Sequence, residues 1–167
     1  GYFIRARVYL GQEKYSEAIV ELTRALKYIT KDDQHPKYRL HWWRATAYHH
    51  LQDYDKAIED YKKAYSLIKN QDNELISDIL IQCANVYDTK KDHKNELKIF
   101  ALMLKHNNKD QMALAGLARL NLVAERYEEA VQYSNINEQC DPRYEGIYLY
   151  RMQAYSALGK KEAAIDD

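Results

Sequence analysis

Five short segments recur in phase along the 167-residue chain, and this periodicity constrains the fold more than any other feature. Their sequences are YSEAI at 15–19, YDKAI at 54–58, HKNEL at 93–97, YEEAV at 127–131 and KEAAI at 161–165. The spacings are 39, 39, 34 and 34 residues. A second marker, a small residue followed three later by an aromatic one, precedes three copies at constant distance: Ala6 and Tyr9, Ala45 and Tyr48, Ala84 and Tyr87. A fixed period of this length predicts stacked supersecondary units that bury their apolar faces against neighbours.

Each unit should be a pair of helices. The chain holds only two Pro and five Gly, and no long run alternates apolar and polar residues, so helices are favoured over strands. We expect first helices at about 1–12, 37–51, 73–89, 110–124 and 144–158. Second helices should span about 15–30, 54–69, 93–106, 127–138 and 161 onward.

The copy from Ala45 to Ala64 shows a small residue, two aromatics beside the turn, and two alanines on the second helix. This pattern resembles the tetratricopeptide repeat (TPR) family, whose unit is a helix–turn–helix hairpin. The resemblance covers essentially the whole chain and implies an all-α fold, a right-handed α-solenoid superhelix of about five hairpins. It implies one array, 1–167, with repeats at about 1–32, 37–71, 73–108, 110–142 and a truncated 144–167.

The third and fifth copies depart from the pattern. Glu96 and Met103 replace the two alanines of the third copy, so its helices should pack more loosely. The fifth copy ends one turn into its second helix, and neither end shows a polar capping repeat. We therefore expect the chain to be a segment of a longer protein, whose uncapped ends could pair with another chain.

Several function classes are disfavoured. Lys plus Arg and Asp plus Glu both number 25, so the chain lacks the basic excess of a nucleic-acid binder, and RNA binding is a third choice. No apolar stretch is long enough to span a membrane. Cys83 and Cys140 lack metal-ligand spacing and should be separate thiols. His41 and His49 lie too far apart on one helix for a metal site, and we expect both on an exposed polar face. No phosphate loop or nucleophile motif occurs, so we expect no enzymatic activity, metal or cofactor.

A partner should bind where the resemblance places the concave face, along the first helices. Trp42 and Trp43 are its most informative pair, because adjacent helical residues point about 100° apart. Either one packs between hairpins while the other faces the groove, or both lie in the core. We hypothesise that Trp42 or Trp43 anchors an extended peptide while Arg39 and Arg7 supply charge. The candidate groove residues are Arg7, Arg39, Trp42, Trp43, Thr46, His49, Gln82, Asn85, Arg119 and Tyr150.

The carboxylate clamp of chaperone-binding TPR domains is absent, since only Asn85 matches it in any register. The leading hypothesis is a non-catalytic scaffold that binds a protein or peptide of unknown identity. The alternative is the sensor or regulatory segment of a larger signalling or transcription-regulating protein. The missing signal peptide favours the cytoplasm, but a longer parent protein would leave the location open.

Overall fold

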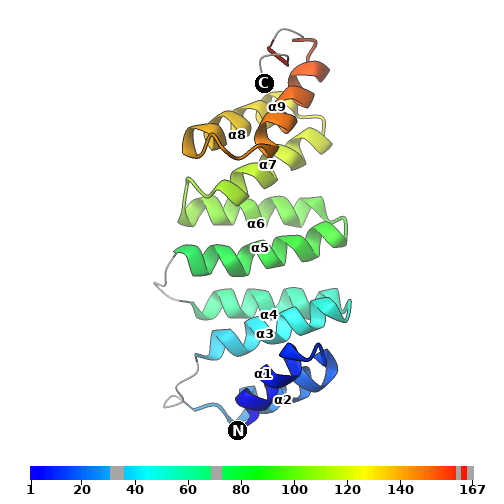
Figure 1. Ribbon diagram of the computed structural model, residues 1–167, viewed down its shortest axis with the longest axis vertical. Helices are drawn as coiled ribbons and strands as arrows, with labels where there is room; N and C mark the ends of the chain where they lie inside the picture. Colours follow the sequence, from blue (N-terminus) through cyan, green and yellow to red (C-terminus); the bar gives the residue numbers. More distant parts are fainter. Residues whose placement is uncertain (31–35, 69–72, 161–162, 165–167) are drawn as a thin grey trace. The chain divides into compact units, whose positions relative to one another are not determined.

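The computed structural model describes residues 1–30, 36–68, 73–160 and 163–164. The described part is helical and divides into two compact units, Gly1–Lys91 and Asp92–Asp167. Figure 1 shows the helices of both units.

Unit 1 contains two complete hairpins and one further helix. α1 (Tyr2–Gly11) pairs with α2 (Tyr15–Tyr28), and α3 (Lys37–His50) pairs with α4 (Tyr54–Leu67). α5 (Asn73–Thr89) packs on α4 and touches α3, and α2 packs on α3. Figure 1 shows α1 in front of α2, and then α3, α4 and α5 in succession. Where the first hairpin meets the second, a core forms from Ala6, Leu22, Ala25 and Leu40.

Unit 2 contains α6 (His93–His106), α7 (Gln111–Val123), α8 (Tyr127–Cys140) and α9 (Gly146–Ala157). α7 and α8 form a hairpin, α6 packs on α7, and α9 packs on both α7 and α8. Gly116 of α7 lies against the ring of Phe100 on α6. A Cβ atom there would lie 2.4 Å from ring carbons of Phe100, so only glycine leaves room for the ring.

The described turns that follow the first helices share a residue with positive φ. The residue two before each recurring segment is left-handed, with φ between 58° and 72°: Glu13, Gln52, Lys91, Glu125 and Gly159. In four of the turns, the next amide N–H donates to a carbonyl oxygen five residues earlier, as from Lys14 to Tyr9 and from Asp53 to Tyr48. This bond satisfies a carbonyl that the helix end leaves unpaired. The turns therefore repeat at 39, 39, 34 and 34 residues, in phase with the sequence.

The predicted all-α hairpin fold is confirmed, and the limits of the nine labelled helices agree with expectation to within two residues. Ala18, Ala57 and Ala130 are fully buried where two helices of a hairpin meet. The predicted start of a last second helix near residue 161 lies outside the described residues. Among the described residues, no helix combines the length and apolar character that a membrane crossing requires.

Glu96, which stands where the other copies have a tight alanine, is only 1% exposed. Its carboxylate accepts a hydrogen bond from Arg119 on α7 and lies 3.1 Å from Nδ1 of His93. A buried carboxylate is tolerated when it is paired in this way. The packing between the helices of the third copy stays a prediction, because α5 and α6 belong to different units.

Candidate binding face

Eight of the ten candidate groove residues lie in unit 1, on α1, α3 and α5. Trp42 and Trp43 sit in the middle of α3 and face different neighbours. The Trp43 ring stacks on Phe3 of α1, with ring centroids 4.9 Å apart, and packs against the core between the first two hairpins. The Trp42 indole N–H donates to the side-chain oxygen of Gln82 on α5, 3.0 Å away. Trp43 thus joins the second hairpin to the first, and Trp42 joins it to the third.

This arrangement follows the repeat. Phe3 and Trp42 occupy one repeat position, 39 residues apart, and Trp43 and Gln82 occupy the next. In both cases the first position of one copy contacts the second position of the following copy. The expectation that one tryptophan packs between hairpins therefore holds for Trp43. Because it supports the core, Trp43 is a poor choice for testing partner binding, and Trp42 is the better one.

Gln82 is held by a cluster of donors from α3 and α4. Its side-chain oxygen lies 3.0 Å from the Trp42 indole nitrogen, 3.0 Å from the Tyr61 hydroxyl and 3.2 Å from the Thr46 hydroxyl. Thr46 also lies 3.1 Å from the Trp42 carbonyl oxygen, to which its hydroxyl can donate. Tyr61 is 1% exposed, and burial raises its pKa to about 12, so it stays a hydrogen-bond donor at neutral pH. Three of the candidate groove residues, Trp42, Thr46 and Gln82, therefore form one hydrogen-bonded cluster with Tyr61.

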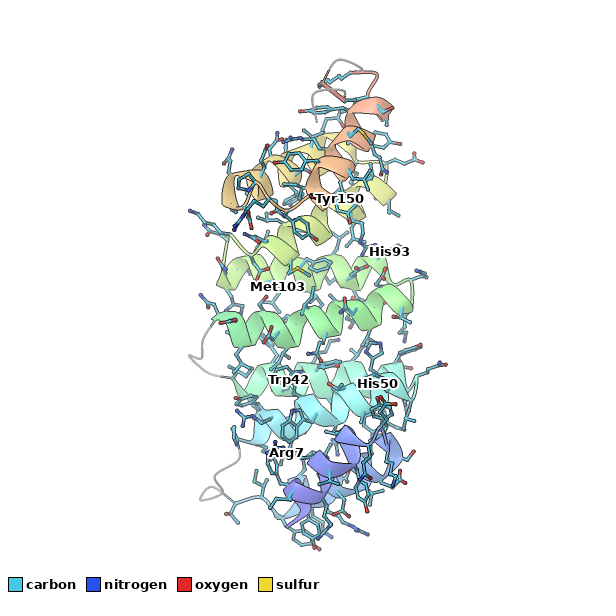
Figure 2. The ribbon with its side chains drawn as sticks, viewed as in Figure 1. Arg7, Trp42, His50, His93, Met103 and Tyr150 are labelled. Carbon is cyan, nitrogen blue, oxygen red and sulfur yellow. The ribbon has the colours of Figure 1, made fainter. Side chains whose placement is uncertain are left out.

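Two arginines on this face carry charge that no described carboxylate neutralises. Arg7 on α1 is exposed, and Figure 2 shows it on the helix next to that of Trp42. Arg39 on α3 is half-buried, with its guanidinium 6.0 Å from the Tyr38 ring. Other arginines of unit 1 are paired: Arg5 and Arg24 both donate to Glu21. On α5, Asn85 and Asp78 are exposed.

The end of α3 carries a row of rings. His50 stacks on Tyr15, with centroids 4.3 Å apart and planes 3° from parallel, and His49 meets the edge of Tyr54 at 6.0 Å. Burial and the neighbouring His50 lower the pKa of His49. His49 is half-buried rather than on an open polar face.

Arg119 and Tyr150, the other two candidates, belong to unit 2. Arg119 donates to the buried Glu96, so its charge is already compensated within the unit. Tyr150 lies half-buried on α9 (Figure 2). The roles of Arg119 and Tyr150 in partner binding therefore stay predictions.

A buried polar triad was missed, and the expectation for His41 is wrong. His41 is 8% exposed, and its Nδ1 lies 2.7 Å from Asp60 of α4. Arg44 donates twice to the same carboxylate, at 2.6 and 2.9 Å. Although burial opposes it, hydrogen bonding to Arg44 and His41 keeps the pKa of Asp60 lowered. A hollow of about 350 Å³ lies beside the triad. The signal was present, because Arg5 and Glu21 repeat the same pair 39 residues earlier.

Residues 4–73 match the sequence profile of the tetratricopeptide repeat family. This segment of the chain is a TPR segment. The fold of the rest agrees, since a TPR protein from Parabacteroides merdae superposes with a TM-score of 0.82 at 16% identity, over 98% of this chain and 61% of that one. No curated protein matches the sequence.

Two further solved structures share the fold. YrrB, described as a TPR protein with an unusual peptide-binding site, aligns at 15% identity with a TM-score of 0.73, over 99% of this chain and 80% of that one. MamA from Desulfovibrio magneticus aligns at 16% identity with a TM-score of 0.76, over 99% and 88%. At such identities the likeness establishes the TPR fold and not a partner. The TPR fold typically serves protein–protein interaction.

Proposed function

We propose that this chain is a non-catalytic scaffold that binds a protein or peptide segment on the face formed by α1, α3 and α5 of unit 1. The observation that carries the proposal is Trp42, half-buried on α3 with its indole N–H tied to Gln82. A ring held in this way loses little conformational freedom when a partner packs on it. Tryptophan and arginine are both enriched among the residues that dominate binding energy, and a side chain that is already ordered loses less entropy on binding.

The free charges indicate the kind of partner. Arg7 and Arg39 present guanidinium groups that no described acidic side chain pairs with, whereas Arg5, Arg24 and Arg44 are consumed by ion pairs. A ligand with an apolar side chain for Trp42 and a carboxylate beside Arg7 or Arg39 complements this surface. Such charge pairs should chiefly raise the association rate and weaken with salt.

A displayed peptide library, selected on the wild-type chain, tests the proposal. Selected peptides should lose at least tenfold in affinity when Trp42→Ala is introduced, and a smaller factor with Arg7→Ala or Arg39→Ala. Arg126→Ala is the matched control, because Arg126 is an exposed arginine of unit 2. Circular dichroism must show that each variant keeps its helices. Peptides that bind the Trp42→Ala variant as tightly as the wild type would overturn the proposal.

A further inference from the structure

The orientation of the Gln82 side-chain amide is determined by its surroundings. An indole N–H can only donate, so the atom that faces Trp42 must be the amide oxygen and not the nitrogen. A flipped amide would place an NH₂ group against that donor. The Tyr61 and Thr46 hydroxyls lie within hydrogen-bond reach of the same oxygen and reinforce the choice.

Counting hydrogens shows that this oxygen is fully used. A carbonyl oxygen has two lone pairs. The Trp42 N–H takes one, and the Tyr61 hydroxyl takes the other at 3.0 Å. The single hydroxyl hydrogen of Thr46 can then be donated to the Trp42 carbonyl oxygen, 3.1 Å away. Gln82 therefore has no acceptor capacity left for a ligand.

The nitrogen of the same amide, unlike the oxygen, has unused hydrogen-bonding capacity. Its two hydrogens have no protein acceptor among the described residues, and Gln82 is only half-buried. Asn85, three residues later on α5, is exposed and its side-chain amide also lacks a protein partner there. Residues three and four apart share one side of a helix. α5 thus presents one donor-only amide and one amide that can both donate and accept.

The charge nearby selects among acceptors. Asp78, four residues before Gln82, is an exposed carboxylate with no cationic partner in the described part of the chain. Its negative charge repels a carboxylate or phosphate placed beside Gln82. A neutral carbonyl escapes that repulsion. Main-chain carbonyls supply such acceptors along an extended peptide, and the adjacent N–H groups match Asn85.

We propose that Gln82 is a main-chain reader: its NH₂ group donates to a backbone carbonyl of an extended peptide lying along α5, while the Trp42 ring receives a neighbouring side chain. This rests on the proposed function, since it assigns a role within the same face. It adds that recognition at Gln82 is independent of the ligand's side chains, because the contact is made to its main chain.

The experiment uses the wild-type chain labelled with ¹⁵N at glutamine and tryptophan, and a peptide selected on it as described above. The Gln82 NH₂ signals are assigned by their loss in Gln82→Glu, a change that keeps an oxygen toward Trp42 but removes the donor. On saturation with peptide, we expect the Gln82 NH₂ signals to move downfield and the Trp42 indole signal to shift.

Affinity supplies the second readout. Gln82→Glu should weaken binding by roughly tenfold, while Gln139→Glu on the exposed face of α8 should leave it unchanged. Replacing one peptide carbonyl by a thioamide, a weaker acceptor, should lower the affinity for the wild type but not for Gln82→Glu. A Trp42 shift without any Gln82 shift would overturn this inference and leave the binding face intact. If neither signal moves although the peptide binds, the proposed face is wrong as well.

Discussion

The second and fourth hairpins use the same backbone arrangement with opposite interiors. Positions 73 residues apart are equivalent, and Ala45 and Ala57 of α3/α4 correspond to Ala118 and Ala130 of α7/α8, all of them fully buried. Around them the chemistry inverts. The triad of α3/α4 is replaced in α7/α8 by three residues without charge, so that His41, Arg44 and Asp60 become Leu114, Leu117 and Tyr133.

At two other positions the fourth hairpin carries the small polar residues and the second hairpin carries tyrosines. Tyr48 and Tyr61 of α3/α4 correspond to Asn121 and Ser134 of α7/α8. Both small polar side chains are buried and donate back into their own helices, Asn121 to the Leu117 carbonyl at 2.8 Å and Ser134 to the Ala130 carbonyl at 2.9 Å. The repeat therefore fixes where backbones touch and leaves the rest to any set of side chains that fills the space and satisfies its polar atoms.

The largest expected effect breaks the polar version of the hairpin. Asp60→Ala removes the carboxylate that both Arg44 and His41 face, and leaves a largely buried guanidinium without its partner. Such a change destabilises proteins by about 3–5 kcal/mol. Urea unfolding followed by tryptophan fluorescence is the measurement, because both tryptophans lie on α3.

A matched variant replaces the triad of the second hairpin by the residues found at the equivalent positions of the fourth hairpin. His41→Leu, Arg44→Leu and Asp60→Tyr together should restore stability to about the wild-type value or exceed it, since well-packed apolar replacements of buried ion pairs are often neutral or stabilising. If the triple variant is as unstable as Asp60→Ala, the two interiors are not interchangeable and the comparison fails.

The next effect sharpens the comparison at one position. Gly116 in the fourth copy is equivalent to Trp43 in the second. In the second copy the aromatic ring at this position is Trp43 itself, on α3. In the fourth copy the ring comes from Phe100 of α6, which lies against Gly116. Gly116→Ala forces a methyl into the buried ring and should lower the unfolding free energy by about 1–3 kcal/mol, reduced by the better helix propensity of alanine. Far-UV circular dichroism in urea measures it.

Gly11→Ala is the control for that change. An added Cβ at Gly11 meets no atom within 4 Å, so the substitution should be neutral or slightly stabilising. Equal losses at Gly11 and Gly116 would mean that the contact with Phe100 does not determine the result.

Much of the fold followed from the sequence because the repeat marks helix limits and the alanines directly. The side-chain partners did not follow, since they depend on a register between helices. The expectation of an open face for His41 is wrong because its partner, Asp60, lies 19 residues later in the chain. The ion pair between Arg119 and Glu96, 23 residues apart, was likewise not predicted. The sequence also left open which neighbours Trp42 and Trp43 contact, because that depends on how the helices pack. Comparing whole copies for charges that recur together, as Arg5–Glu21 and Arg44–Asp60 do, would have found the triad.

A smaller effect concerns the turns, where the two hairpins should behave alike. Gln52 and Glu125 adopt φ values of 62° and 58°, which glycine tolerates without strain. Gln52→Gly and Glu125→Gly should each change the unfolding free energy by less than about 1 kcal/mol, with relief of strain offset by a more flexible unfolded chain. Gly159→Ala, at φ 72°, should be destabilising. A large loss from either glycine variant, measured by thermal unfolding, would contradict a shared turn geometry.

The smallest expected effect is a pH dependence of stability that the second hairpin has, through His49, and the equivalent position of the fourth hairpin lacks. Burial and the nearby His50 lower the pKa of His49 in the folded state, so the unfolded chain binds a proton first as the pH falls below 6.5. Stability contributed by neutral His49 is present above pH 6.5 and is lost as the pH falls toward the lowered folded value. The loss should stay below about 1 kcal/mol, because solvent reaches the ring. The equivalent residue of the fourth hairpin is Leu122, which does not titrate. His49→Leu should therefore flatten the dependence of the fluorescence-detected urea midpoint between pH 7 and 5.5, and an unchanged slope would assign that dependence to another group.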